Sequence, residues 1–145
     1  MNRRVLLLIC SLLLALGCGG NDGATGVDEI PNIDGSWTYT NAWSVNGLFS
    51  CRYAPSSLTI DQTGGTFTGR LVTSDLLCSN PDEPEEVSQG QNFGNSIVNG
   101  TVNAAGDVTF DLSDETSHHT GRVNGNSMSG SLVFGEVPGT WAASR

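Results

Sequence analysis

Residues 124–134 read NGNSMSGSLVF, and this stretch combines the two signals that decide the fold. The Asn-Gly-Asn turn is followed by an alternation in which Met128, Gly130 and Leu132 share one parity and serines take the other. Asn and Gly accept the positive φ angles of tight hairpin turns, and a period of two is typical of a strand with one buried face. The stretch therefore predicts a hairpin turn that leads into a half-buried β-strand.

The same alternation recurs from residue 34 onward, and no segment shows the period of an amphipathic helix. Turn-like residues at 63–65, 104–106 and 124–126 separate neighbouring runs. We expect eight strands, with a further short strand allowed at 48–53, at residues 35–44, 57–61, 66–73, 96–103, 107–112, 118–124, 127–134 and 140–144. Short strands joined by tight turns predict an all-β fold, a small up-and-down antiparallel β-barrel of about eight strands. A two-sheet β-sandwich is the alternative.

Glycine recurs inside the predicted strands between apolar residues of the same parity. The pattern occurs as Phe67-x-Gly69-x-Leu71, Val98-x-Gly100-x-Val102 and Met128-x-Gly130-x-Leu132. Side chains alternate across a strand, so each glycine is expected to face inward with its two neighbours. Strong strand curvature in a small barrel explains such glycines, and space for a ligand is the alternative explanation.

The connection at residues 74–94 is the exception to short turns. It contains two prolines and a run of acids and has no strand pattern. We expect a loop without regular secondary structure, either simply solvated or facing a partner or a cation.

The N-terminus carries an export signal. Arg3 and Arg4 precede residues 5–16, which are apolar except for Ser11, and Gly17 stands before Cys18. The run is shorter than the ~20 apolar residues of a membrane span. Residues 19–33 are rich in Gly and polar residues and predict a flexible tether.

This arrangement resembles the lipobox of bacterial lipoproteins. The resemblance implies a signal peptide at 1–17, acyl chains on Cys18 as the membrane anchor, a tether at 18–33 and a folded domain at 34–145. Gly19 follows the cysteine where an Asp would resemble the inner-membrane retention signal. The outer membrane of a Gram-negative-type bacterium is therefore the expected location.

Charge and cysteine content narrow the partners. The formal charge is −9 and all six basic residues are Arg, which argues against nucleic acid and against anionic lipid head groups as binding partners.

Once Cys10 leaves with the signal and Cys18 is acylated, Cys51 and Cys78 remain as a pair. In an exported chain this pair predicts a disulfide.

No residue pattern points to catalysis. His118 and His119 are adjacent, so on a strand they face opposite sides and cannot jointly hold a metal ion or relay protons. The chain lacks a serine nucleophile elbow, a zinc-protease motif and a phosphate-binding glycine loop. We expect no catalytic residue, no metal site and no cofactor, and the protein is predicted not to be an enzyme.

Large apolar residues on the inward parity either fill the barrel or line a pocket for a small apolar ligand. The candidate ligand-binding residues are Trp37, Phe67, Phe110, Met128, Leu132 and Trp141. Closure of the barrel would bring Trp37 and Trp141 near each other, because they lie in the first and last strands.

The segment Gly35-Ser36-Trp37 resembles the Gly-x-Trp that opens lipocalin and avidin-type barrels. In lipocalins that Trp packs under an Arg near the last strand, a role that Arg122 or Arg145 could fill. Small barrels that inhibit bacterial metalloproteases in the periplasm also open with Gly-x-Trp and carry one disulfide, and they insert an N-terminal trunk into the protease. The sequence thus supports two hypotheses: a carrier of a small apolar ligand, or an envelope protein that acts through protein contacts or proteinase inhibition.

Overall fold

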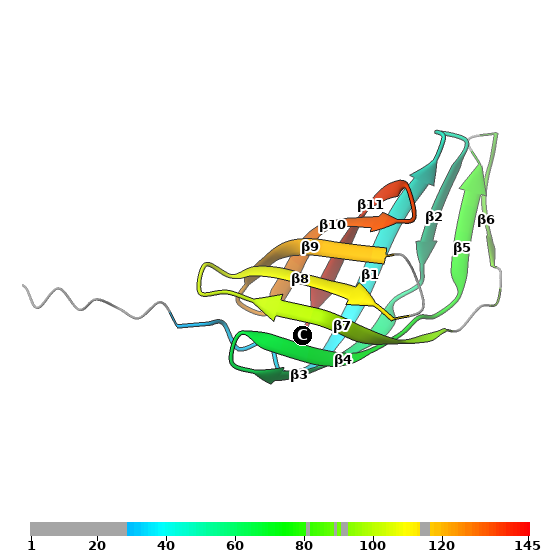
Figure 1. Ribbon diagram of the computed structural model, residues 1–145. Helices are drawn as coiled ribbons and strands as arrows, with labels where there is room; N and C mark the ends of the chain where they lie inside the picture. The colour runs from blue at the N-terminus through cyan, green and yellow to red at the C-terminus, as the bar shows by residue number, and fades with distance from the viewer. Residues whose placement is uncertain (1–28, 81, 89, 91–92, 114–116) are drawn as a thin grey trace, which may run out of the picture.

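The computed structural model describes residues 29–80, 82–88, 90, 93–113 and 117–145 (Figure 1). Within these ranges the regular secondary structure consists of β-strands. None of the described residues form a helix that is long and apolar enough to cross a bilayer. The strands are β1 (Gly35–Val45), β2 (Phe49–Tyr53), β3 (Ser56–Thr63), β4 (Thr66–Val72), β5 (Leu76–Asn80), β6 (Glu83–Ser88), β7 (Gly94–Val102), β8 (Asp107–Leu112), β9 (Ser117–Asn124), β10 (Ser127–Phe134) and β11 (Val137–Ser144).

Eight of these strands form a closed antiparallel barrel. The order β1-β3-β4-β7-β8-β9-β10-β11 returns to β1, because Thr38 pairs with Ser144 and Trp43 with Gly139. The eight strands expected from the alternation are all present, with ends shifted by at most three residues, and the optional short strand is β2. The prediction of a small β-barrel is confirmed, and the sandwich alternative is not found.

A second group of strands extends the sheet beyond the barrel. The first half of β1 pairs with β3, whereas its second half pairs with β2, and β5 and β6 continue outward from β2. We call the second half of β1 together with β2, β5 and β6 the wing. In Figure 1 it projects at the upper right.

The wing corrects the prediction for residues 74–94. A structureless loop was expected there, but the segment contains β5 and β6. All of β5 is half-buried, so it has no buried parity that an alternation could reveal. Its strand structure comes from pairing with β2, a contact between residues distant in sequence.

The barrel interior is filled by an apolar core. Its aromatic members include Trp37, Phe67, Phe110 and Trp141, all 2–3% exposed. Gly130 of β10 lies directly against the backbone of β9. It pairs with Gly121, and a Cβ on Gly130 would overlap the carbonyl oxygen of Thr120. The close backbone approach supports the curvature explanation for this inward-facing glycine.

One inward-facing residue was placed wrongly by the alternation. Val98 is 36% exposed, while Val102 on the same strand is buried. The register of β7 against β8 shifts between Val98 and Thr101, where Asn99 has a φ of 55°. This bulge inserts one residue and turns the side chain of Val98 outward, because each one-residue slip reverses the face of a strand residue.

The end of the barrel where the chain enters is closed. The Trp37 Nε1–H donates to the carbonyl of Ile33 at 2.9 Å, and the Gln62 Oε1 accepts from the backbone N–H of Ile33 at 2.6 Å. The Arg145 guanidinium lies 4.4 Å from the centre of a Trp37 ring and donates to the carbonyls of Asn32 and Asp34. We call this arrangement the closed end.

Two expectations concern residues at the closed end. Arg145, rather than Arg122, covers the first tryptophan, since Arg122 forms a salt bridge with Asp107 at 3.0 Å. Ile33, which was expected in the tether, is fully buried in the core. Cys18 and the signal and tether up to residue 28 lie outside the described residues.

Candidate functional site

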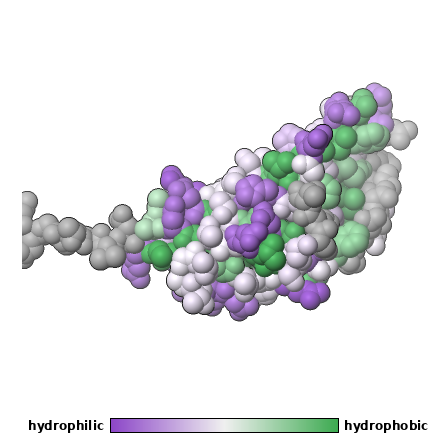
Figure 2. Space-filling view, in the orientation of Figure 1, coloured by the Kyte–Doolittle hydropathy of each residue, from purple (hydrophilic) through white to green (hydrophobic). Residues whose placement is uncertain are grey.

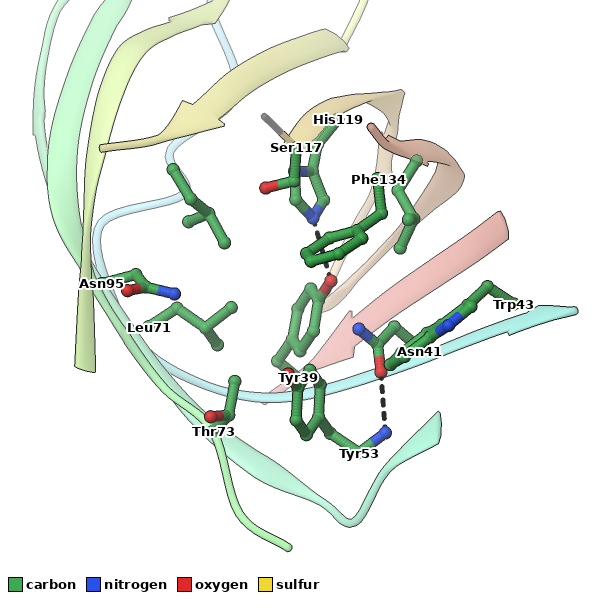
Figure 3. A pocket seen from close by; sticks show the side chains of 12 residues that line it. Tyr39, Asn41, Trp43, Tyr53, Leu71, Thr73, Asn95, Ser117, His119 and Phe134 are labelled. Atoms are coloured by element: carbon green, nitrogen blue, oxygen red, sulfur yellow. Dashed lines mark hydrogen bonds between the residues drawn. The ribbon is translucent and has the colours of Figure 1, made fainter. Parts of the chain in front are cut away.

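A small cavity lies at the opposite, open end of the barrel, where β1 passes into the wing (Figure 3). Its volume is about 20 Å³, which is room for one water molecule. It is lined by Tyr39, Asn41, Trp43, Tyr53, Leu71, Thr73, Asn95, Leu112, Ser117, His119, Leu132 and Phe134.

The floor of the cavity is a buried tyrosine–histidine pair. The Tyr39 hydroxyl and the His119 Nε2 are 2.9 Å apart, and both side chains are 1% exposed. The imidazole stacks on Phe110, with ring centres 4.2 Å apart, and meets Trp141 edge to face. Figure 3 shows the two side chains pointing toward each other and joined by this hydrogen bond.

Burial, and to a smaller extent the neighbouring His118, lowers the pKa of His119 from 6.5 to about 4. Asp111 and the Phe110 backbone act in the opposite direction, but burial is the larger effect. The imidazole is therefore neutral at pH 7.

Buried polar side chains concentrate at this cavity. The described chain contains five buried polar residues, and four of them, Thr73, Asn95, Ser117 and His119, line the cavity. Thr73 is satisfied, because its hydroxyl donates to the Phe93 carbonyl and accepts from the Phe93 N–H. Polar groups are unusual in the core of a small barrel, so their gathering at one place indicates a specific use.

Two of these polar atoms have no hydrogen-bond partner among the described residues. They are the Ser117 Oγ and the His119 Nδ1, both shielded from solvent. Ser117 and His119 are separated by one residue on β9 and so share a face. A buried polar atom without a partner costs about 1–3 kcal/mol, so the open end carries an energetic cost that a bound group could remove.

The rim of the cavity is aromatic. Trp43 lies between Tyr53 and Phe134, with ring centres 5.5 Å and 6.2 Å away. Asn41 supports this wall, since its Oδ1 accepts the backbone N–H of Tyr53 at 3.0 Å.

The apolar surface continues from the rim onto the wing. Val45 pairs with Phe49 and Trp43 with Cys51, so these side chains share one face of the sheet. We call this surface the wing face; it comprises Trp43, Val45, Phe49, Tyr53, Leu76 and the disulfide. Phe49 is 49% exposed and Phe134, at its edge, is 39% exposed. Figure 2 shows hydrophobic surface on the wing as well as near the end where the chain enters.

The disulfide prediction is confirmed. Cys51 of β2 and Cys78 of β5 are directly paired and joined by a disulfide. The bond holds the outer strands of the wing to the strand that borders the barrel.

The six candidate ligand-binding residues all belong to the packed core, and Met128 also borders a groove of about 210 Å³ that is lined by residues of β1, β10 and β11. The six are Trp37, Phe67, Phe110, Met128, Leu132 and Trp141, each at most 3% exposed. Of these, Leu132 lines the cavity. A pocket for a drug-sized ligand needs ~300 Å³ or more, and these side chains occupy the interior in which such a pocket would lie.

A polar cluster lies on the outer wall of the barrel, around Asp111 and His118. His118 Nδ1 lies 2.6 Å from Asp111 Oδ1, and Asn99 donates to the other oxygen of that carboxylate. The hydrogen bond from Asn99, and then that from His118, lowers the pKa of Asp111. Among the described residues, no group of three or more His, Cys, Asp or Glu side chains could hold a metal ion.

Sequence reasoning missed the polar floor and the aromatic rim. Tyr39 and Trp43 share the inward parity of Trp37, and that parity could have placed them inside. The pairing of Tyr39 with His119 could not have been found, because it depends on how the barrel closes between two residues with a sequence separation of 80.

The chain was compared with known proteins. No protein-family model matches the sequence, and no curated protein matches it.

Proposed function

We propose that this protein is a non-enzymatic, membrane-anchored envelope lipoprotein whose barrel binds a protein partner through the wing face. The observation that carries the proposal is the contrast between a filled interior and an exposed apolar surface. The core residues are nearly all below 4% exposure, whereas Phe49 on the wing face is 49% exposed and Leu48, the residue before it, is 61% exposed. Apolar surface that gathers around a pocket rim marks a contact site.

The anchor follows from the N-terminal sequence. The basic n-region, the apolar run and Gly17-Cys18 support acylation of Cys18 in the outer membrane. The charge of −9 favours a neutral or basic partner over nucleic acid or an anionic surface.

A carrier in the lipocalin manner is less well supported. The Trp37–Arg145 contact at the closed end is the one that the lipocalin resemblance implies, and it supports a similar architecture. The cavity of about 20 Å³, however, is far too small to enclose a ligand.

Inhibition by an inserted N-terminal trunk is also less well supported. Hydrogen bonds from Gln62 and Arg145 hold residues 31–34 against the closed end, so the last part of such a trunk is already engaged.

Site-specific photo-crosslinking in cells that make the full-length protein tests the proposal. A photoreactive phenylalanine analogue at Phe49 should give one discrete protein adduct, and Phe134→Ser in the same chain should remove it. The matched control places the analogue at Thr68, an exposed position on the outer wall of β4. The same adducts from both positions would contradict the proposal, and so would a stoichiometric small molecule found by native mass spectrometry of the protein from its own envelope.

The anchor has a separate test. Cys18→Ser should leave an unlipidated precursor that is released from membranes, measured by fractionation and fatty-acid labelling. Persistent labelling of that variant would overturn the lipobox interpretation.

A further inference from the structure

We infer that the cavity at the open end binds the tip of a neutral hydrogen-bonding group, a carboxamide or a hydroxyl, whose attached flat apolar body stacks on the aromatic rim. The inference rests on the proposed function and names the chemistry of the group that a partner would insert.

The first argument is the pair of atoms left without partners. Ser117 Oγ and His119 Nδ1 are buried and lack hydrogen bonds within the described residues, although they line a space large enough for a polar atom. Ser56 gives the contrast, as a serine buried to the same extent whose hydroxyl donates to the Ala54 carbonyl and accepts the Ser74 N–H. Where the fold needs a buried serine for itself, it therefore satisfies the hydroxyl.

The second argument is charge. Among the described residues, no Asp, Glu, Lys or Arg lines the cavity, and its histidine is neutral at pH 7 because burial holds its pKa near 4. A charged tip would enter without a counter-ion, at a high desolvation cost. The occupant is therefore a neutral group.

The third argument is the hydrogen-bonding capacity of the floor. A neutral imidazole offers one donor and one acceptor, and Nε2 already engages the Tyr39 hydroxyl. If Nε2 accepts from the tyrosine, Nδ1 is a donor, and if Nε2 donates, Nδ1 is an acceptor. The Ser117 hydroxyl can act as a donor or as an acceptor. Carboxamides and hydroxyls both donate and accept, so they match this floor in either tautomer.

The fourth argument is the shape of the entrance. A volume of about 20 Å³ admits one water-sized group, such as a hydroxyl or the oxygen or nitrogen of a carboxamide, and leaves the rest of the ligand outside. There it meets Trp43, which is half-buried and flanked by Tyr53 and Phe134. Stacked and edge-to-face ring contacts favour a flat apolar body at this position.

A series of ring compounds with different tips tests the inference on purified full-length protein. Benzamide carries the expected neutral tip, toluene has an apolar tip and benzoate a charged one. Chemical shifts of the Ser117 and His119 amides and of the Trp43 indole would be followed by NMR during titration. We expect benzamide to bind on the order of fivefold more tightly than toluene, and benzoate to give no saturable shift.

Two variants separate the floor from the rim. Ser117→Ala should remove the advantage of benzamide and leave toluene binding unchanged, which also shows that the variant is folded. Ser131→Ala, on the exposed outer face of β10, is the matched control and should change neither. Equal affinity for benzamide and toluene, absence of a saturable benzamide shift, or unchanged benzamide binding in Ser117→Ala would each overturn the inference.

The outcome is distinguishable from that of the proposed function. Loss of tip selectivity with an intact crosslink at Phe49 would refute only the cavity inference. Tip selectivity without a position-specific crosslink would refute only the protein partner.

Discussion

The two ends of this barrel treat their buried polar groups in opposite ways. At the closed end the Trp37 N–H, the Gln62 amide and the Arg145 guanidinium all have protein partners. At the open end the Ser117 hydroxyl and one imidazole nitrogen of His119 have none among the described residues. The closed end thus has the polar contacts expected of a purely structural plug, while the open end has buried polar atoms that could still form hydrogen bonds.

The difference in stability between the two ends should be largest when the tryptophan at each end is truncated, Trp37 at the closed end and Trp43 at the open end. Trp37→Ala should lower the free energy of unfolding by about 4 kcal/mol, because it removes a buried ring from the core and the stacking surface of Arg145. Trp43→Ala should cost about 1 kcal/mol, because that ring is half-buried and faces the cavity. Urea unfolding measures both, and equal losses would show that the ends do not differ.

The disulfide is a device of the open end alone. Cys51→Ser with Cys78→Ser should lower stability by about 3 kcal/mol, since the bond closes a loop with a sequence separation of 27. Amide hydrogen exchange should accelerate most in β5 and β6, which are held to the barrel through β2. Equal acceleration at residues 31–37 would argue that the wing and the closed end unfold as one unit.

Acid should act on the open end before it acts elsewhere. The pKa of His119 is about 4 in the folded chain and near 6.5 when unfolded, so the unfolded state binds the proton more readily. Protonation of His119 therefore does not affect the free energy of unfolding above pH 6.5. As the pH is lowered from 6.5 toward 4, the free energy of unfolding falls, and the loss reaches about 3 kcal/mol at pH 4. His119→Gln should flatten the stability profile between pH 6.5 and 4, measured by urea unfolding across that range. A wild-type profile that is already flat there would contradict the burial argument.

Two buried serines give the smallest and most discriminating comparison. Ser56→Ala should destabilise by about 1 kcal/mol, since it breaks two hydrogen bonds. Ser117→Ala should leave stability unchanged or raise it by up to about 1 kcal/mol, since it removes a hydroxyl without a partner. Thermal unfolding resolves the sign, and a clear loss in Ser117→Ala would mean that its hydroxyl serves the fold.

The sequence predicted the barrel well because the barrel is built from local alternation. Each barrel strand buries one parity against a shared core, and the turns between most of them are short. The Cys51–Cys78 pairing was also predictable, because those two cysteines were left after the other two were assigned to the signal and the anchor.

The rest could not be predicted, for reasons that are visible in particular residues. β5 has no buried parity, so only its partner strand makes it a strand. The bulge at Asn99 reverses Val98 through a single positive φ angle that the alternation does not encode. The cavity floor joins Tyr39 to His119 across a sequence separation of 80. Residue patterns within single strands do not show which residues so far apart in the sequence come into contact.

The direction in which the chain enters the barrel has a mechanical consequence. β1 starts beside the closed end and runs for 11 residues into the wing, a length of roughly 35 Å. Any attachment upstream of residue 29 therefore pulls on the end stapled by Arg145 and leaves the opposite end free. A lipid on Cys18 would attach the molecule to a bilayer through its closed end, so that the wing face would be the part of the barrel farthest from the point of attachment.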